Sequence, residues 1–503
     1  MTLGDAPLTR REMRERTDSD GSAEFGTDDA VTSRLGEPSP LPVSALTAVD
    51  RSAAAGPARE DEPLSTTGRI ALGWVDVDGL TASGATPTAS FDLLPPLRRR
   101  RRVRGRVVAV PALAVVALAV AYTAAMLLWP LSSVEPTVTA SEDTALRGAA
   151  SALTWPGEGE AGVGVAGFAT AASSDEPAQM ASTTKLVTAL VLLDRSPLEV
   201  GDPGPSYDFD FADRQEYWTY VAQNQSALNV PDGGSLTEYQ MLQGMLIASA
   251  SNYADRLATD AFGSIEEYTA AANAWLADNG IDGMTVADAS GFDRDNVATP
   301  AAMVTLAEKA IANPVIAEIV ATASAELPGA GEFENTNELL GTDGVDGLKT
   351  GSYLGSYNLV ATRGVEAQGT ELELVVSVAA QPTDDDRVAE TARLLDAAAA
   401  ELAQPSTLPA GSVVATVTTA WGAATPVVTD DDASLILWNG TTAETEPSVD
   451  LGDDRDAGAD AGSLTLTGPA GSVDVPVSLQ DALPGPDAWW RLTHPLQLLG
   501  VAD

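Results

Sequence analysis

The apolar positions along the chain separate an aperiodic N-terminal stretch from one long apolar run and two patterned regions. Residues 1–97 are rich in Asp, Glu, Ser, Thr, Pro and Gly and show no periodic apolar positions, which predicts a disordered tail. Residues 107–129 are uncharged and apolar. As a helix they would extend about 35 Å, enough to cross the hydrocarbon core of a bilayer. We therefore expect a transmembrane helix.

The residues before this run predict its orientation. Residues 98–106 form a basic juxtamembrane segment with seven arginines. An excess of arginine marks the cytoplasmic side, so the tail is expected in the cytoplasm and the rest of the chain outside. A secretory signal peptide is the alternative, but its apolar region is usually shorter and lies at the N-terminus.

Two patterned regions follow a polar linker at residues 130–148. Residues 149–404 alternate apolar runs with helical periodicity, which predicts a mixed α/β domain. Its expected strands are 163–168, 359–362 and 372–378, and its expected helices are 185–193 and 387–402. Residues 405–503 contain short alternating segments separated by turn residues, which indicates a small, β-rich C-terminal domain.

Composition excludes several classes of site and partner. The chain has no cysteine and one histidine, His494, so Cys nucleophiles, disulfides and Cys/His zinc sites are excluded. A Ser-His-Asp triad would need His494 to reach back from the C-terminal domain. The net charge of -44 argues against nucleic-acid binding, which needs a basic face. We expect neither a metal nor a cofactor.

Lysine is rare, and two of three lysines lie in motifs that carry chemistry. Lys185 ends the S-x-x-K motif that begins at Ser182, Lys349 opens K-T-G, and Lys309 lies in an ordinary helical pattern. Residues at i and i+3 share a helix face, so Lys185 can act as the base for Ser182. It must be neutral to do so, and both burial and the charge of Lys349 would lower its pKa. S-x-x-K followed downstream by K-T-G is the signature of serine acyl-enzymes that act on D-alanyl peptides and β-lactams.

The K-T-G motif suits recognition of a peptide end. Lys349 and Thr350 offer a cation and a hydroxyl for a carboxylate, on an expected edge strand that could pair with an extended peptide. Gly351 removes a side chain where the ligand must come close.

Three segments resemble one family. Residues 180–189, residues 345–351 followed by 357–361, and the D-x-S-G stretch at 288–292 are similar to low-molecular-mass penicillin-binding proteins that are serine D-alanyl-D-alanine carboxypeptidases. The resemblance covers about residues 150–400. It implies a transpeptidase-like α/β (α+β) fold of the DD-peptidase/β-lactamase type, with an antiparallel sheet flanked by helices.

The resemblance also implies roles for the motif residues. Ser182 would be the nucleophile and Lys185 the base, and Lys349 with Thr350 would bind the terminal carboxylate. The backbone N–H groups of Ser182 and Ser352 would form the oxyanion hole.

The family's third motif, S-x-N, is altered in this chain. Ser249 stands first, Ser251 stands where Asn is expected, and Asn252 comes one place late. We expect Ser249 to relay a proton between Lys185 and the leaving amine. We favour Ser251 in the Asn position, donating to the substrate carbonyl with lowered activity. The alternative is a shifted loop in which Asn252 serves.

These features predict a membrane-anchored carboxypeptidase that removes the terminal D-Ala from peptidoglycan stem peptides through an acyl-enzyme and is acylated by β-lactams. A serine β-lactamase is one alternative, although no E-x-x-L-N segment lies between Ser249 and Lys349. A non-catalytic peptidoglycan binder, suggested by Ser251, is the other.

Overall fold

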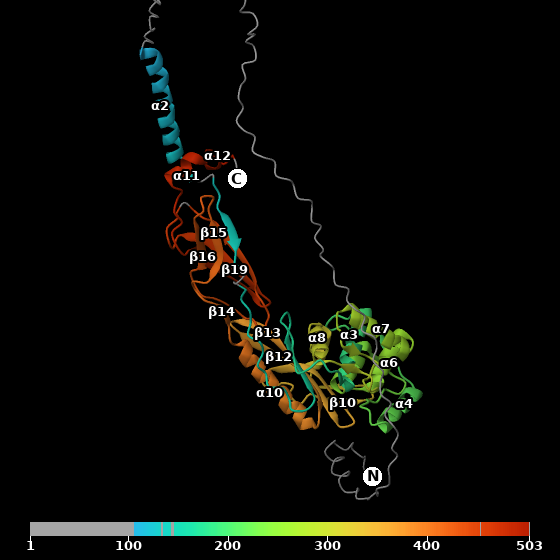
Figure 1. Ribbon diagram of the computed structural model, residues 1–503. Coiled ribbons are helices and arrows are strands. Elements are labelled where there is room, and N and C mark those ends of the chain that lie inside the picture. The colour runs from blue at the N-terminus through green and yellow to red at the C-terminus, as the bar shows by residue number, and fades with distance from the viewer. Residues whose placement is uncertain (1–104, 132–133, 142–144, 453, 502–503) are drawn as a thin grey trace, which may run out of the picture. The chain divides into compact units, whose positions relative to one another are not determined.

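The computed structural model describes residues 105–131, 134–141, 145–452 and 454–501 (Figure 1). The predicted disordered tail and the arginines up to Arg104 lie outside these residues. The described residues belong to one compact unit, residues 100–503.

The long apolar run forms one helix, α2 (Gly105–Leu128). From residue 109 onward almost all its side chains are exposed, and Met126 is the buried exception. Residues 109–128 are long and apolar enough to cross a membrane, judged by length and composition. A helix that is apolar all round suits a nonpolar environment on all sides.

A five-stranded antiparallel sheet lies in the middle of the described part of the chain. Its order is β11 (Val345–Tyr353), β12 (Ser356–Ala367), β13 (Thr370–Gln381), β2 (Glu160–Val165) and β3 (Ala171–Ala172). The strands predicted at 359–362 and 372–378 lie within β12 and β13. β11, which carries the K-T-G motif, is an edge strand.

The alternation of glycine and valine along β2 explains how one helix covers each face of this sheet. Gly162 and Gly164 face α8 (Pro300–Ile311): an added Cβ would lie 2.7 Å from the oxygen of Pro300 at Gly162 and 2.4 Å from Val304 at Gly164. Val163 and Val165 point to the other face and share an apolar cluster with α10 (Asp384–Leu402). Because successive side chains of a strand point to opposite faces, glycines admit one helix closely while valines build the core beneath the other.

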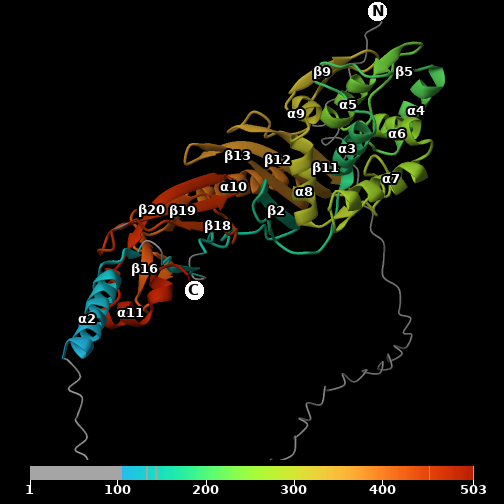
Figure 2. The ribbon, with the colours of Figure 1, turned by 90° about the horizontal axis from the view of Figure 1, so that it is seen from above.

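A helical group adjoins the β11 side of the sheet (Figure 2). Its central helix is α3 (Lys185–Arg195), buried at nine consecutive positions. The 3-10 turn η4 (Ala181–Thr184) leads directly into α3. The other helices of the group are α4 (Phe211–Ala222), α5 (Glu238–Ile247), α6 (Ser251–Phe262), α7 (Ile265–Asp278) and α9 (Pro314–Val320).

Short strands connect these helices. The central strand β8 (Val297–Ala298) pairs with β4 (Ala178–Gln179) and with β7 (Met284–Thr285). β5 (Ser206–Asp208) pairs with β6 (Ser235–Thr237), and β9 (Ser324–Leu327) pairs with β10 (Gly331–Glu334).

The C-terminal region contains a second antiparallel sheet with its own apolar core. The order of its strands is β1 (Thr137–Ala140), β15 (Val413–Thr418), β16 (Ala424–Thr429), β20 (Gly471–Leu479), β19 (Asp460–Gly468) and β18 (Glu444–Val449). β14 (Ser406–Leu408) pairs with β17 (Ala433–Leu435), and the helices α11 (Ala488–Thr493) and α12 (Pro495–Leu498) follow. β1 comes from the stretch predicted as a linker, so residues that precede the five-stranded sheet in the sequence complete this second sheet.

Candidate active site

Ser182 lies in η4, immediately before the buried helix α3. Its neighbour Ala181 has a φ of 48°, which is unusual for a residue with a side chain. Ser182 is half-buried, whereas the residues on both sides of it are buried. The chain therefore presents this hydroxyl at the surface of an otherwise closed segment.

Lys185 is completely buried and directs its amine at three oxygens. Nζ lies 3.0 Å from Oγ of Ser182, 3.3 Å from Oγ of Ser251 and 2.6 Å from the backbone oxygen of Ser290. The predicted pairing of Ser182 with Lys185 is thus present in the structure, and a third side chain completes the cluster.

Burial is the main influence on the charge of this amine. It lowers the pKa of Lys185 from 10.5 to about 8, while the carboxylates of Asp255 and Asp288 act in the opposite direction. Burial also lowers the pKa of Lys349 well below its usual value, and the charges of Lys185 and Arg387 add to this effect. The charge of Lys185 thus lowers the pKa of Lys349, whereas the expected effect of Lys349 on the pKa of Lys185 is not among the influences on Lys185.

The K-T-G strand packs against the backbone of the nucleophile segment. A Cβ added to Gly351 would lie 2.9 Å from the oxygen of Met180 and 3.2 Å from the nitrogen of Ser182. Thr350 Oγ1 is 2.6 Å from Oγ1 of Thr336, and Nζ of Lys349 donates to the oxygen of Thr350 at 3.1 Å. Gly351 thus allows β11 to approach η4 closely.

Ser352, which follows the K-T-G motif, differs from Lys349 in its exposure to solvent. Ser352 is exposed one position beyond Gly351, whereas Lys349 is buried within the same strand. The strand therefore leads from a buried amine to a surface hydroxyl beside the Ser182 segment.

In the altered S-x-N segment, the second serine, Ser251, contacts Lys185, and no such contact is described for the first, Ser249. Ser249 is buried with a φ of 63°, and among the described contacts its hydroxyl makes no hydrogen bond with Lys185. Ser251 begins α6 and contacts Nζ. The side chain of Asn252 is held elsewhere: it accepts from Leu228 N at 3.1 Å and donates to Leu228 O at 2.8 Å.

The D-x-S-G stretch forms a tight turn that supports Lys185. Asp288 Oδ1 accepts from the nitrogens of Ser290 and Gly291 at 3.0 and 2.5 Å and from Nδ2 of Asn296 at 3.0 Å. This arrangement fixes the Ser290 carbonyl that receives the Lys185 bond. The sequence marked this stretch only by its resemblance, without a role for any residue.

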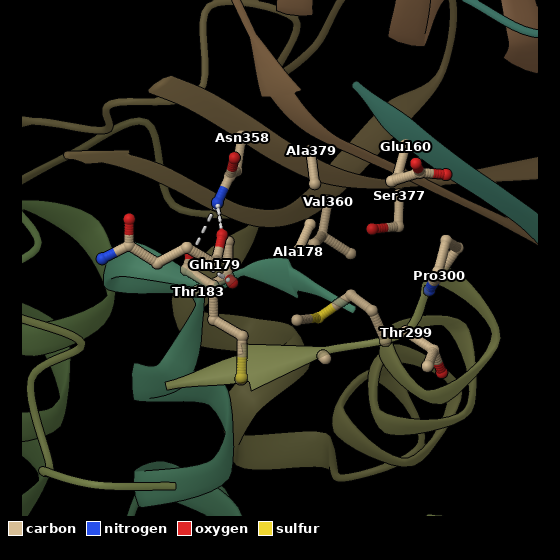
Figure 3. A pocket seen from close by; sticks show the side chains of 13 residues that line it. Glu160, Ala178, Gln179, Thr183, Thr299, Pro300, Asn358, Val360, Ser377 and Ala379 are labelled. Carbon is tan, nitrogen blue, oxygen red and sulfur yellow. Dashed lines mark hydrogen bonds between the residues drawn. The ribbon is translucent and has the colours of Figure 1, made fainter. Parts of the chain in front are cut away.

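Two further polar residues, to which the sequence assigned no role, connect elements around the site by hydrogen bonds. Arg387 on α10 is buried, forms an ion pair with Asp384 at 2.5 Å and donates to the oxygens of Gly351 and Asn358, both at 3.2 Å. Asn358 on β12 donates to the oxygens of Gln179 and Met180 at 2.7 and 2.8 Å. Figure 3 shows this amide reaching across a small pocket to the segment before Ser182.

No group of His, Cys, Asp and Glu side chains within the described ranges could hold a metal ion. The chemistry of the cluster is that of a hydroxyl beside a buried amine.

A comparison with family models identifies this region. Residues 169–380 match the model for D-alanyl-D-alanine carboxypeptidase, Peptidase_S11. This part of the chain is similar to that family. The match confirms the resemblance seen in the motifs, the fold class and the enzyme class, a serine-type D-Ala-D-Ala carboxypeptidase.

Two solved structures illustrate the similarity to known proteins. The Streptomyces K15 DD-transpeptidase is 22% identical, with 49% of this chain and 100% of that chain covered and a TM-score of 0.43. The D-alanyl-D-alanine carboxypeptidase from Mycobacterium tuberculosis H37Rv is 26% identical, with 50% and 96% covered and a TM-score of 0.43. A search of curated proteins found no match.

Proposed function

We propose that this carboxypeptidase is anchored in the membrane by α2 and removes the terminal D-Ala from peptidoglycan stem peptides through an acyl-enzyme on Ser182. The observation that carries the mechanism is the 3.0 Å contact between Oγ of Ser182 and the buried amine of Lys185. An amine with a pKa of about 8 is partly neutral near pH 7 and can accept the serine proton.

Acylation follows from this pair. Neutral Lys185 takes the proton as Oγ of Ser182 attacks the carbonyl carbon of the penultimate D-Ala. The N–H groups of Ser182 and Ser352 are proposed to stabilise the oxyanion. Lys185 then returns the proton to the departing D-Ala nitrogen as the peptide bond breaks, and we propose that a serine hydroxyl of the S-x-N segment relays it. Water releases the peptide from Ser182.

Carboxylate binding is assigned to the edge strand β11. The arriving carboxylate would favour the charged form of Lys349, whose pKa is otherwise low because it is buried beside Lys185. Thr350 adds a hydroxyl, and we propose that the edge strand β11 pairs with the substrate backbone. A β-lactam carries both a carboxylate and a strained amide, so it would enter the same cleft and acylate Ser182.

The assay uses the full-length chain in detergent, a peptide ending in D-Ala-D-Ala and a labelled penicillin. Release of D-Ala together with slow turnover of penicillin is the expected result. Fast penicillin hydrolysis would favour a β-lactamase, and labelling without peptide hydrolysis would favour a binder. Ser182→Ala should abolish D-Ala release and labelling, and activity that survives it would show a different nucleophile.

The lysines offer a matched pair of variants. Lys185→Ala should reduce acylation by about 100-fold or more, the usual contribution of a general base. Lys309→Ala changes the third lysine, which lies on α8, and should leave acylation unchanged. Equal effects of the two substitutions would remove Lys185 from the mechanism.

A further inference from the structure

The C-terminal segment, residues 488–501, contacts the end of the long apolar helix. The hydroxyl of Tyr122 donates to the oxygen of Leu492 at 2.7 Å. Met126, one turn after Tyr122, is buried, whereas the other side chains described along α2 are largely exposed. Figure 1 shows α11 beside this end of α2. One side of the helix terminus is therefore covered by residues from the opposite end of the sequence.

Arg491 donates hydrogen bonds to backbone oxygens at the C-terminus of α2. Its Nη1 lies 3.4 Å from the oxygen of Met126, 3.3 Å from that of Leu127 and 2.8 Å from that of Trp129. The last carbonyls of a helix have no partner within the helix. A cation at the C-terminus also interacts favourably with the helix dipole. Arg491 thus caps α2 from more than 360 residues away.

The same segment is attached to the C-terminal sheet through Trp490. The ring of Trp490 meets that of Trp421 edge-on, with centroids 5.6 Å apart, and stacks on His494 at 4.9 Å. Trp421 lies between β15 and β16, and its Nε1 donates to the oxygen of Pro484 at 2.7 Å. The segment therefore joins the β-rich region to α2.

The outward side of this segment is apolar and exposed. Trp489 is 74% exposed, Leu496 57% and Val501 72%. Although the chain has a net charge of -44, positions 488–502 contain no Asp or Glu, and Arg491 supplies a positive charge. This composition differs from that of the surrounding acidic protein and suits a surface that carries anionic lipid headgroups.

We propose that residues 488–501 form a second membrane contact, which lies in the lipid headgroup interface around the extracytoplasmic end of α2 and inserts Trp489. The occupant is a lipid surface because the segment is continuous with the terminus of the proposed span, at the depth where tryptophan is favoured. Arg491 holds the segment at that depth. This inference rests on the proposed membrane anchoring by α2.

The absence of cysteine from the chain allows single labels to test this contact. Three variants of the full-length protein, Leu118→Cys, Trp489→Cys and Ser472→Cys, are labelled with the fluorophore NBD and reconstituted into vesicles of phosphatidylcholine and phosphatidylglycerol. Leu118 lies in the middle of α2. Ser472 is an exposed residue beside the β19–β20 turn, and Pro469 in that turn is close to Gly167 of the catalytic region.

The expected result is a blue-shifted emission, quenched by brominated lipid, at positions 118 and 489 but not at 472. A label at 489 that reports water while 118 reports lipid would overturn the second contact and leave the anchor in place. A label at 118 that reports water would overturn the anchor itself. The two failures are therefore distinguishable.

A second substitution tests the role of Arg491. In the Trp489→Cys background, Arg491→Gln removes the charge and the Nη1 donor to the carbonyls of Met126, Leu127 and Trp129. A spin label at 489 should become more mobile and less protected by lipid, whereas a label at 472 should not change. Unchanged mobility at 489 would show that Arg491 does not hold the segment.

Discussion

At the residue scale, the reactivity of the site depends on the environment of Lys185. Its amine is removed from water, which favours the neutral form, and two carboxylates partly restore the charged form. One of these, Asp255, is one helical turn after Ser251 on α6 and accepts a hydrogen bond from Tyr220 at 2.8 Å. Burial raises the pKa of Asp255 to about 6, so this residue is mostly ionised at neutral pH.

Removal of that carboxylate should shift the pH dependence of acylation. Lys185 is active as a base only when neutral, so the rate should rise as the pH passes through about 8. Asp255→Asn keeps an acceptor for Tyr220 but removes a charge that raises the pKa of Lys185. In a plot of kcat/KM against pH, the ascending limb should therefore move to lower pH.

The control for this substitution is Asp260→Asn. Asp260 lies on the same helix and pairs with Arg256 at 2.6 Å. Its replacement should leave the limb unchanged. A limb that stays in place, or moves to higher pH, in Asp255→Asn would contradict the electrostatic role of Asp255.

The two serines of the altered motif provide a second residue-scale prediction. Ser251 Oγ is 3.3 Å from Lys185 Nζ, and no corresponding bond is described for Ser249. Ser251→Ala should reduce the acylation rate by about 100-fold or more if its hydroxyl relays the proton. Ser249→Ala should have a smaller effect. Penicillin acylation followed by stopped flow measures both, and the reverse order would restore Ser249 as the relay.

At the element scale, the site depends on backbone segments that approach each other without intervening side chains. Gly351 brings β11 against η4, and Gly291 brings the D-x-S-G turn against the same segment from another direction. A Cβ at Gly291 would lie 1.8 Å from the oxygen of Ala181, and its φ is 82°. The position of Ser182 is therefore determined by close backbone packing.

Gly291→Ala should destabilise the fold and displace Ser182. The strained φ and the overlap together should lower the free energy of unfolding by about 2–5 kcal/mol. Gly355→Ala is the matched control, since Gly355 has a φ of 84° but no atom within 4 Å of the added Cβ. Its cost should be limited to about 1–2 kcal/mol. Denaturant unfolding measures both values, and equal costs would argue against close packing at Gly291.

At the scale of the whole molecule, segments that are far apart in the sequence lie side by side. Residues 137–140 precede the catalytic region and form β1 of the sheet that residues 413–479 otherwise build. The C-terminal segment returns to α2. The catalytic region is thus inserted between two segments of chain that meet in the β-rich region, which lies next to α2.

The proposed topology predicts which parts of the chain are accessible outside the cell. A membrane-impermeant maleimide applied to intact cells should label Ser472→Cys but not Ser65→Cys, because residue 65 belongs to the predicted cytoplasmic tail. Permeabilised cells should label both. Labelling of position 65 in intact cells would contradict the orientation predicted from the arginines.

Local spacing explains how much of the site could be predicted. The pairing of Ser182 with Lys185 follows from one turn of chain, and the edge position of Lys349 was expected from the K-T-G motif, which lies within the family match at residues 169–380. Arg387 and Asn358 could not be identified in this way. Their roles depend on packing between elements far apart in the sequence.

The sequence by itself determined the pairing of Ser182 with Lys185, because residues three apart lie on one face of a helical turn, and it determined the long apolar helix α2, because an uninterrupted apolar run sets its length. Only the tertiary structure decided which second serine reaches Lys185, how far burial lowers the pKa of that lysine, and that Arg491 caps α2. Those features arise where distant segments exclude water and bring charges together, and neither burial nor long-range contact is contained in local spacing.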